Sequence, residues 1–331
     1  MFLDLVRSKT AANPERLARV LEGLRRYQEA PRPDPDPGAP VIAESMGASL
    51  RDYGGDGPDI LFVPSLINPP TVLDLGDRSL LRWLATQGRR VLLLDWGWPD
   101  EARHGLSVGG HVEQILLPLM ETLGSPPDLA GYCLGGTMAA AAAQIGGARS
   151  LATIAAPWRF HGFPEPERER LAGLWQGSKA VAQRLGVLPM EALQVAFWSL
   201  DSERTVRKFE EFATLEEAAA NSFVLLEDWA NDGAPVSFAA AREMFEDLFG
   251  ADLPGSGRWQ VGGQVIDPAS LPCPLLNIVS TSDRIVPHAS ALPAGERIDL
   301  ARGHVGMVVG SKAREELWQP LSSWLSRVSP N

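Results

Sequence analysis

The sequence predicts an α/β fold, in which a mostly parallel sheet is flanked by helices and a helical segment is inserted between two of its strands. Short apolar runs bounded by turn residues recur along the chain, and helix-like stretches separate several of them. A long block with only helical patterns interrupts this alternation. The chain length is consistent with this fold, because 331 residues correspond to about two domains, or to one large domain with an insertion.

The first 40 residues are expected to form an appendage to the main body. Residues 13–28 carry apolar side chains at helical spacing, and Asn13 precedes them as an N-cap. The run PRPDPDPGAP (31–40) contains five prolines, which fix φ and remove hydrogen-bond donors. Residues 1–40 are therefore predicted to be an N-terminal helix followed by an extended linker.

Residues 41–157 and 258–331 are predicted to form the two parts of the sheet-containing core. The runs without polar alternation are typical of strands that are buried on both faces. Such runs lie at 59–66, 90–97, 127–136, 150–157 and 274–283, with expected helices at 79–87 and 112–123.

Residues 158–257 are predicted to form a helical cap inserted into this core. Amphipathic helical patterns dominate the segment, and strand signals are absent from it. A helical insertion between parallel strands is typical of a cap at the carboxyl edge of the sheet, where ligands of α/β proteins bind.

Charge and composition exclude several classes of protein. With 30 basic and 41 acidic residues the net charge is −11, which argues against a nucleic-acid-binding footprint. Two cysteines cannot form a secreted disulfide framework, and no apolar stretch approaches the roughly 18 residues of a membrane span. The N-terminus has no export signal, so we expect a soluble, cytoplasmic protein.

The motif that carries chemistry is Gly131-Tyr132-Cys133-Leu134-Gly135. It has the G-x-C-x-G spacing of a nucleophile elbow, and it lies between a predicted strand and an Ala-rich predicted helix. The glycines leave room for a strained turn, and the helix N-terminus favours a thiolate. The alternative is that Cys133 is a small buried apolar residue, as Cys273 is expected to be.

An elbow nucleophile needs an acid and a histidine downstream, in that order. Asp283 ends a predicted strand, and His304 lies in a glycine-containing loop 21 positions later. We therefore predict a Cys133–His304–Asp283 triad, in which His304 takes the thiol proton and Asp283 fixes its tautomer. As alternatives, Asp283 is a turn or helix-capping residue and His304 has only a structural role.

An acyl-transfer site also needs an oxyanion hole. The backbone N–H of Leu134 is one expected donor, and Leu66 or Ile67 in the loop VPSLINPP is expected to supply the other. The sequence has no metal-ligand motif, G-x-G-x-x-G or Walker A motif, so we expect neither a metal nor a permanently bound cofactor.

The sequence resembles the polyhydroxyalkanoate synthases, most of all the short catalytic subunit of the two-component (class III) enzymes. The resemblance runs from about residue 41 to 328 in consistent order. The segments that carry it are SLINPPTVLDLGDRSL, VLLLDWGWPD, GYCLGGT, IAAPWRF, FVLLEDWANDG, WQVGGQVIDPASLPCPLLNIVSTSDRIVP and GHVGMVVGSKAREEL.

The resemblance implies an α/β-hydrolase fold and transfer of (R)-3-hydroxyacyl units from coenzyme A to a growing polyester. Cys133 would accept the acyl group, His304 would be its base, and Asp283 would help to activate the incoming hydroxyl. A coenzyme A thioester is then the substrate, a second synthase subunit and a homodimer are the expected partners, and the polyester granule surface is an expected location besides the cytoplasm.

Two other functions are alternatives to the synthase. One is catalytic and uses the same triad, and the other is not catalytic. A thioesterase or polyhydroxyalkanoate depolymerase would have the same triad, with water as the acyl acceptor. A non-catalytic granule-associated protein would retain the triad without using it. The products distinguish these functions. A synthase releases coenzyme A and forms polymer, a hydrolase releases free acid, and a non-catalytic protein does neither.

Overall fold

The computed structural model describes residues 2–32 and 38–329. The chain divides into two compact units. Unit 1 joins residues 1–37 to residues 193–232, and unit 2 contains residues 38–192 and 233–331. Both units are therefore built from two separate stretches of the chain.

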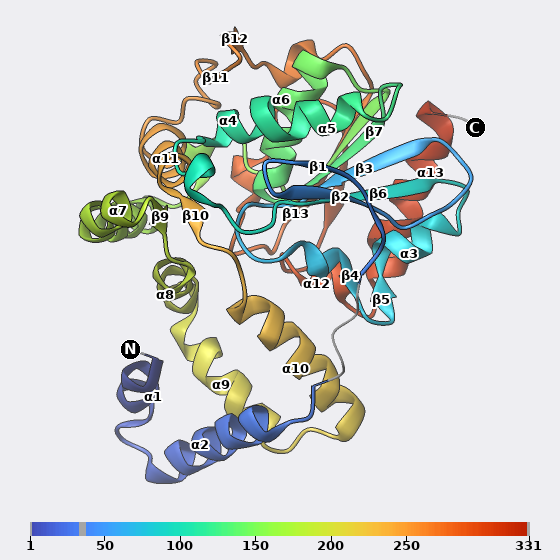
Figure 1. Ribbon diagram of the computed structural model, residues 1–331. Helices are drawn as coiled ribbons and strands as arrows, with labels where there is room; N and C mark the ends of the chain where they lie inside the picture. Colours follow the sequence, from blue (N-terminus) through green and yellow to red (C-terminus); the bar gives the residue numbers. More distant parts are fainter. Residues whose placement is uncertain (1, 33–37, 330–331) are drawn as a thin grey trace. The chain divides into compact units, whose positions relative to one another are not determined.

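Unit 2 contains an eight-stranded sheet with the order β1-β2-β6-β3-β7-β8-β13-β14 (Figure 1). From β6 to β14 neighbouring strands are parallel, whereas β1 and β2 pair antiparallel at one edge. The strands are β1 (Val41–Ser45), β2 (Ala48–Asp52), β3 (Asp59–Val63), β6 (Arg90–Asp95), β7 (Asp128–Tyr132), β8 (Ser150–Ile154), β13 (Leu275–Ser280) and β14 (Glu296–Leu300). The five strands predicted from apolar runs are confirmed as β3, β6, β7, β8 and β13.

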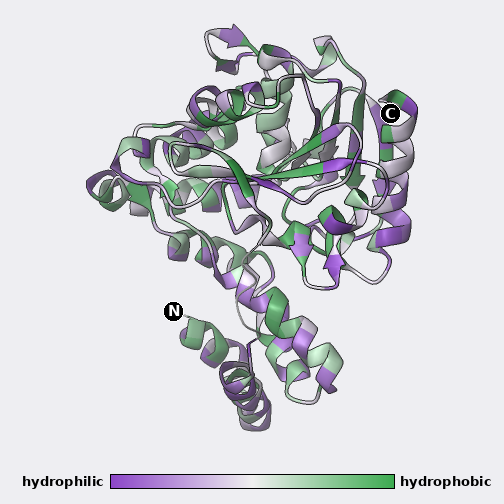
Figure 2. Cartoon of the chain, turned by 45° about the vertical axis from the view of Figure 1, so that its right-hand side comes forward, coloured by the Kyte–Doolittle hydropathy of each residue, from purple (hydrophilic) through white to green (hydrophobic). Residues whose placement is uncertain are grey.

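Helices cover both faces of this sheet, as the apolar strands require. Figure 1 shows α4, α5 and α6 over one face and α3 and α13 on the other. Their bounds are α3 (Leu80–Ala85), α4 (Val108–His111), α5 (Leu117–Glu121), α6 (Leu134–Gly146) and α13 (Gln319–Val328). In Figure 2 the central strands are mostly green, whereas purple is prominent on the outer helices. The predicted α/β class is therefore confirmed.

The remaining elements of unit 2 are short, apart from α7. Its other α-helices are α7 (Glu165–Leu185), the start of α8 (Met190–Leu200), α11 (Phe238–Arg242) and α12 (Gly306–Val309), and π-helical segments occur at Val112–Leu116, Glu243–Gly250 and Arg314–Trp318. Three pairs of two-residue strands accompany them: β4 (Asp74–Leu75) with β5 (Arg78–Ser79), β9 (Val187–Leu188) with β10 (Val236–Ser237), and β11 (Gln260–Val261) with β12 (Gln264–Val265).

Unit 1 consists mainly of α1 (Phe2–Thr10), α2 (Pro14–Glu29), α9 (Ser202–Phe212) and α10 (Glu217–Asn231). The predicted N-cap of α2 is confirmed, because the Asn13 side chain accepts a hydrogen bond from the Arg16 N–H. At the crossing of α2 and α9 there is no room for a side chain on Gly23, since a Cβ there would lie 1.8 Å from the Phe209 carbonyl oxygen. Val6, Val20, Val206 and Phe209 form the buried core around this crossing.

The structure differs from the expected segments in two respects. Residues 193–232 of the expected cap 158–257 associate with residues 1–37, because the apolar face of α9 packs against α1 and α2. The expectation that 158–257 lacks strands is wrong, since β9 and β10 pair within it. These ladders are too short to produce an apolar run. Of the predicted linker 31–40, residues 33–37 lie outside the described residues.

Candidate active site

Cys133 occupies the sharp turn between β7 and α6. Its φ and ψ of 56° and −132° lie where residues other than glycine are strained. Hydrogen bonds from the Cys133 N–H to the Ile154 carbonyl and from the Gly136 N–H to the Cys133 carbonyl, both 2.9 Å, hold the turn in place. The residue remains partly exposed at the carboxyl end of the strand.

The glycines of the motif are required by the close approach of strand and helix. A Cβ on Gly131 would lie 2.4 Å from the Gly136 Cα, and one on Gly135 would lie 2.1 Å from the Val63 carbonyl oxygen. Both contacts are with backbone atoms, which cannot rotate away. The spacing G-x-C-x-G is therefore what allows α6 to begin directly behind the cysteine.

Asp283 and His304 come from the loops that follow β13 and β14. Asp283 Oδ2 lies 2.6 Å from His304 Nδ1, and both side chains are buried. The other carboxylate oxygen, Asp283 Oδ1, accepts the N–H groups of Ile285 and Val286 at 2.7 and 3.1 Å. Asp283 thus stabilises its own turn with one carboxylate oxygen and contacts the imidazole of His304 with the other. The turn role that was the alternative for Asp283 is therefore compatible with its contact to His304.

The third member of the expected triad, Cys133, also interacts with His304. Burial lowers the pKa of His304, but the negative charges of Cys133 and Asp283 and hydrogen bonds to both outweigh it and raise the pKa to about 10. Both Cys133 and Asp283 therefore act on the imidazole of His304. With Nδ1 engaged by Asp283, the other ring nitrogen is the one available to the thiol.

Tyr132 is a site residue that the sequence analysis did not identify. Its hydroxyl donates to the His304 carbonyl oxygen at 3.2 Å, and its ring lies 4.9 Å from the imidazole. Burial, together with the charges of Cys133 and Asp283, raises the pKa of Tyr132 well above its ordinary value, so the hydroxyl stays protonated. It occupies the variable second position of G-x-C-x-G, where the motif gives no signal.

The expected oxyanion donors lie in two segments next to the elbow. Leu134 is the first residue of α6, so its N–H has no carbonyl partner within the helix. In the loop after β3, the Ile67 N–H donates to Ser65 Oγ at 3.1 Å. This bond engages Ile67, which favours Leu66 as the second donor.

Cys273 and His111 do not belong to the group formed around Cys133. Cys273 precedes β13 at the opposite edge of the sheet, where burial and the charge of Asp128 raise the pKa of its thiol to about 11. His111, in α4, is buried as well, since only 2% of it is exposed. Among residues 2–32 and 38–329, no cluster of three or more potential metal ligands occurs, and no helix is long and apolar enough to span a bilayer.

The chain is similar over most of its length to curated subunits of polyhydroxyalkanoate polymerases. It is 29% identical to the poly(3-hydroxyalkanoate) polymerase subunit PhaC of Haloferax mediterranei, over 82% of this chain and 59% of the relative. It is 26% identical to the PhaC subunit of Allochromatium vinosum, over 81% of this chain and 80% of the relative. The resemblance found in the sequence is thus confirmed, although the chain spans only 59% and 64% of the two haloarchaeal relatives. No known family profile matches it.

The solved structures to which this chain is similar have the α/β-hydrolase fold. The esterase of Thermogutta terrifontis is 17% identical with a TM-score of 0.51, covering 88% of this chain and 99% of that one. The enol-lactonase of Burkholderia xenovorans is 18% identical with a TM-score of 0.53, covering 87% and 100%. At these identities the comparison concerns the fold, and the chain has the α/β-hydrolase fold with a helical insertion.

Proposed function

We propose that the protein is an acyltransferase that polymerises (R)-3-hydroxyacyl units from coenzyme A thioesters into polyhydroxyalkanoate. The observation that carries the proposal is a partly exposed cysteine on a nucleophile elbow beside a buried His304–Asp283 pair, in a chain similar to PhaC subunits. The substrate, the product and the roles of the residues all belong to the proposal.

In the first step the Cys133 sulfur attacks the thioester carbonyl. His304 takes the thiol proton and passes it to the departing coenzyme A sulfur, so that an acyl-cysteine thioester and free coenzyme A result. Asp283 holds the imidazole that becomes cationic in this step. The N–H groups of Leu134 and Leu66 are the proposed donors to the carbonyl oxygen while it carries negative charge.

In the second step the hydroxyl of another hydroxyacyl thioester attacks the acyl-cysteine. The hydroxyl proton leaves through the His304–Asp283 pair and returns to the Cys133 sulfur, while the carbon–sulfur bond breaks and an ester bond forms. Water in place of this hydroxyl would make the protein a hydrolase. The acyl acceptor therefore decides between the two enzyme classes.

The test follows the acyl group as well as the thiol. Purified protein is incubated with (R)-3-hydroxybutyryl-coenzyme A that is labelled in the acyl group, and coenzyme A, free acid and polyester are quantified together. We expect thiol release matched by high-mass polyester, and a mass increase of one acyl unit on the peptide containing Cys133 early in the reaction. Free 3-hydroxybutyrate as the main product, or an acyl group on another residue, would overturn the proposal.

The proposal includes a second subunit and a homodimer as partners, and a location at the polyester granule. Analytical sedimentation of the chain, alone and co-expressed with the proposed second synthase subunit, tests the assembly. An increase in specific activity on addition of the second chain is expected, and equal activity with and without it would remove that part of the proposal.

A further inference from the structure

The loop after β3, which carries the proposed oxyanion donor Leu66, is held by a tryptophan from the neighbouring strand. β3 and β6 are parallel neighbours in the sheet, and Trp96 is the first residue after β6. Its indole N–H donates to the Pro64 carbonyl oxygen at 3.0 Å, and only 5% of Trp96 is exposed. This hydrogen bond joins the two loops that leave the carboxyl ends of β3 and β6.

The Pro64 carbonyl lies one peptide group before the Leu66 N–H. The carbonyl belongs to the planar peptide group between Pro64 and Ser65, and the Leu66 N–H belongs to the next group, so the two groups are joined at the Cα of Ser65. Ser65 is itself buried, and its Oγ accepts the Ile67 N–H at 3.1 Å. A fixed Pro64 carbonyl therefore restricts the direction in which the Leu66 N–H points.

The same carbonyl lies against the nucleophile elbow. A Cβ added to Gly135 would lie 2.5 Å from the Pro64 carbonyl oxygen. Gly135 directly follows Leu134, whose N–H is the other proposed donor. The Trp96 hydrogen bond thus acts on the loop at the point where the loop touches the elbow.

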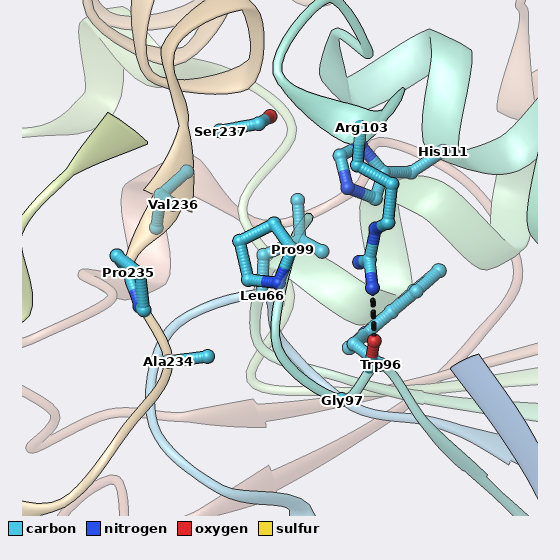
Figure 3. A pocket seen from close by; sticks show the side chains of 10 residues that line it. All are labelled: Leu66, Trp96, Gly97, Pro99, Arg103, His111, Ala234, Pro235, Val236 and Ser237. Carbon is cyan, nitrogen blue, oxygen red and sulfur yellow. Dashed lines mark hydrogen bonds between the residues drawn. The ribbon is translucent and has the colours of Figure 1, made fainter. Parts of the chain in front are cut away.

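Trp96 is itself fixed by its neighbours. Arg103 is only 2% exposed, and its Nη1 donates to the Trp96 carbonyl oxygen, which Figure 3 shows as a dashed line. The His111 ring meets the indole edge-on, with centroids 5.7 Å apart and an interplanar angle of 83°. The cavity beside these side chains measures about 20 Å³, which is room for about one water molecule. The indole therefore has little space in which to move away from the loop.

We propose that Trp96 is a positioning residue, which holds the Leu66 N–H at the place where the carbonyl oxygen of the substrate gains negative charge. The inference rests on the proposed acyl transfer. Oxyanion stabilisation depends on donors that are in place before the charge develops, so a displaced donor lowers the rate more than it weakens substrate binding. A tryptophan with only a packing role would not separate these two effects.

Trp96→Phe tests the proposal, because it keeps an aromatic ring and removes the indole N–H. The rate of acyl-Cys133 formation from (R)-3-hydroxybutyryl-coenzyme A is measured by rapid quenching and peptide mass spectrometry, and alkylation of Cys133 by iodoacetamide is measured separately. Alkylation displaces iodide from a saturated carbon and forms no oxyanion, so it does not need the donors. We expect acylation at saturating substrate to be at least about tenfold slower, with less than about twofold change in KM and in alkylation.

Trp324→Phe is the matched control. Trp324 is also buried, with 3% exposed, but its indole N–H donates to Glu296 at the amino end of β14. Wild-type rates of acylation and alkylation are expected from this variant. Equal acylation rates in wild type and Trp96→Phe, or parallel decreases in acylation and alkylation, would overturn the inference and leave the acyl-transfer function standing.

A trifluoromethyl ketone separates the inference from the identity of the substrate. The Cys133 thiolate adds to the carbonyl of trifluoromethyl propyl ketone, so that a carbon–sulfur bond forms, the carbonyl π bond breaks and its electron pair remains on the oxygen as an oxyanion. Protection of Cys133 against iodoacetamide measures the affinity of the ketone. At least about tenfold weaker protection is expected in Trp96→Phe. Equal protection would overturn the inference, whereas a wild type that forms this adduct without being acylated by the thioester would contradict only the proposed substrate.

The thermal midpoint of each variant is measured alongside, so that misfolding is recognised. If Trp96→Phe does not fold, Arg103→Met decides, because it removes the donor to the Trp96 carbonyl and leaves the indole in place. Acylation and ketone protection should then fall at least about threefold with alkylation unchanged. Wild-type values for both in a folded Arg103→Met would overturn the inference.

Discussion

The parallel strands of the sheet begin at its amino edge and end at its carboxyl edge, and these two edges bury charge in opposite ways. At the amino edge, Asp128 begins β7 and is fully buried, but it accepts hydrogen bonds from Arg89 at 3.0 Å, Arg149 at 3.2 Å and Ser150 Oγ at 2.7 Å. At the carboxyl edge, Cys133 follows the same strand and meets His304 and Asp283. One five-residue strand separates the two networks.

The difference lies in what the partners can do. Around Asp128 the charged partners are arginines, which remain charged at any ordinary pH, so the network has a single state. Around Cys133 the partner His304 can gain or lose a proton, and Cys133 itself remains partly exposed. A fully paired network indicates a structural role, whereas a buried acid–base pair beside an accessible nucleophile indicates chemistry.

The two cysteines give the sharpest test of this contrast, with the largest expected effect. Cys133→Ala is expected to lower the rate of coenzyme A release by about 10⁴-fold or more, because the nucleophile is lost. Cys273→Ala is the matched control at the amino edge, and wild-type rates are expected from it. The assay measures thiol release from (R)-3-hydroxybutyryl-coenzyme A. Comparable losses in both variants would mean that position relative to the sheet does not decide the role of the thiol.

The amino edge is expected to dominate stability. Asp128→Ala leaves the buried guanidinium of Arg89 without its carboxylate and is expected to lower the free energy of unfolding by about 3 to 5 kcal/mol. Urea unfolding followed by circular dichroism measures the change. Asp299→Ala, at an exposed carboxylate paired with Arg297, is the control and should change stability by less than about 1 kcal/mol. A small effect of Asp128→Ala would contradict the structural role of this network.

Through His111, the carboxyl edge is expected to make the stability of the fold depend on pH. Because burial lowers the pKa of His111 to about 4 from 6.5, the unfolded chain binds a proton between these pH values and the folded chain does not. Stability should therefore fall as the pH drops from 6.5 to 4, by about 3 kcal/mol from this group. His111→Asn removes that part of the decline while keeping a donor near the Ser107 carbonyl.

Urea unfolding at several pH values between 7 and 4 compares the two proteins. The stability difference between wild type and His111→Asn should shrink, or reverse, as the pH falls. His161→Asn is the control, because the His161 side chain is 54% exposed. Parallel pH profiles for wild type and His111→Asn would show that His111 is not kept neutral by its burial.

The smallest predicted effect concerns Tyr132. Tyr132→Phe removes the hydrogen bond to the His304 carbonyl but keeps the ring against the imidazole. We expect a decrease in kcat/KM of about fivefold, equivalent to roughly 1 kcal/mol. The rate at which iodoacetamide alkylates Cys133 should fall in parallel, with little change in the thermal midpoint. An unchanged alkylation rate would mean that the hydroxyl does not help to position His304.

Local sequence was sufficient where a single turn or run carried the information. The Gly131 and Gly135 spacing follows from backbone contacts that any side chain would obstruct, so the elbow was readable. The Asn13 cap and the buried strands follow from equally local rules.

Other features depend on partners distant in the sequence. The β1–β2 hairpin consists of short, partly exposed strands joined at Met46 and Gly47, and such strands have no continuous apolar run. The association of residues 1–37 with 193–232 depends on which apolar faces meet, which periodicity alone does not specify. Arg103 ends the short 3₁₀-helix Glu101–Arg103, and only the surrounding segments make it a buried cation.

The two-part construction of unit 1 has a consequence for synthesis on the ribosome. Helices α1 and α2 emerge first, and α9 begins roughly 170 residues after α2 ends, which at about 5 to 20 residues per second is roughly nine to thirty-five seconds. During that interval the apolar face around Val20 has no partner within its own unit. When residue 232 is added, the two halves of unit 1 can join and close residues 38–192 into a loop. At that moment β13, β14, Asp283 and His304 have not yet been translated, so the elbow is present before the histidine that is to serve it.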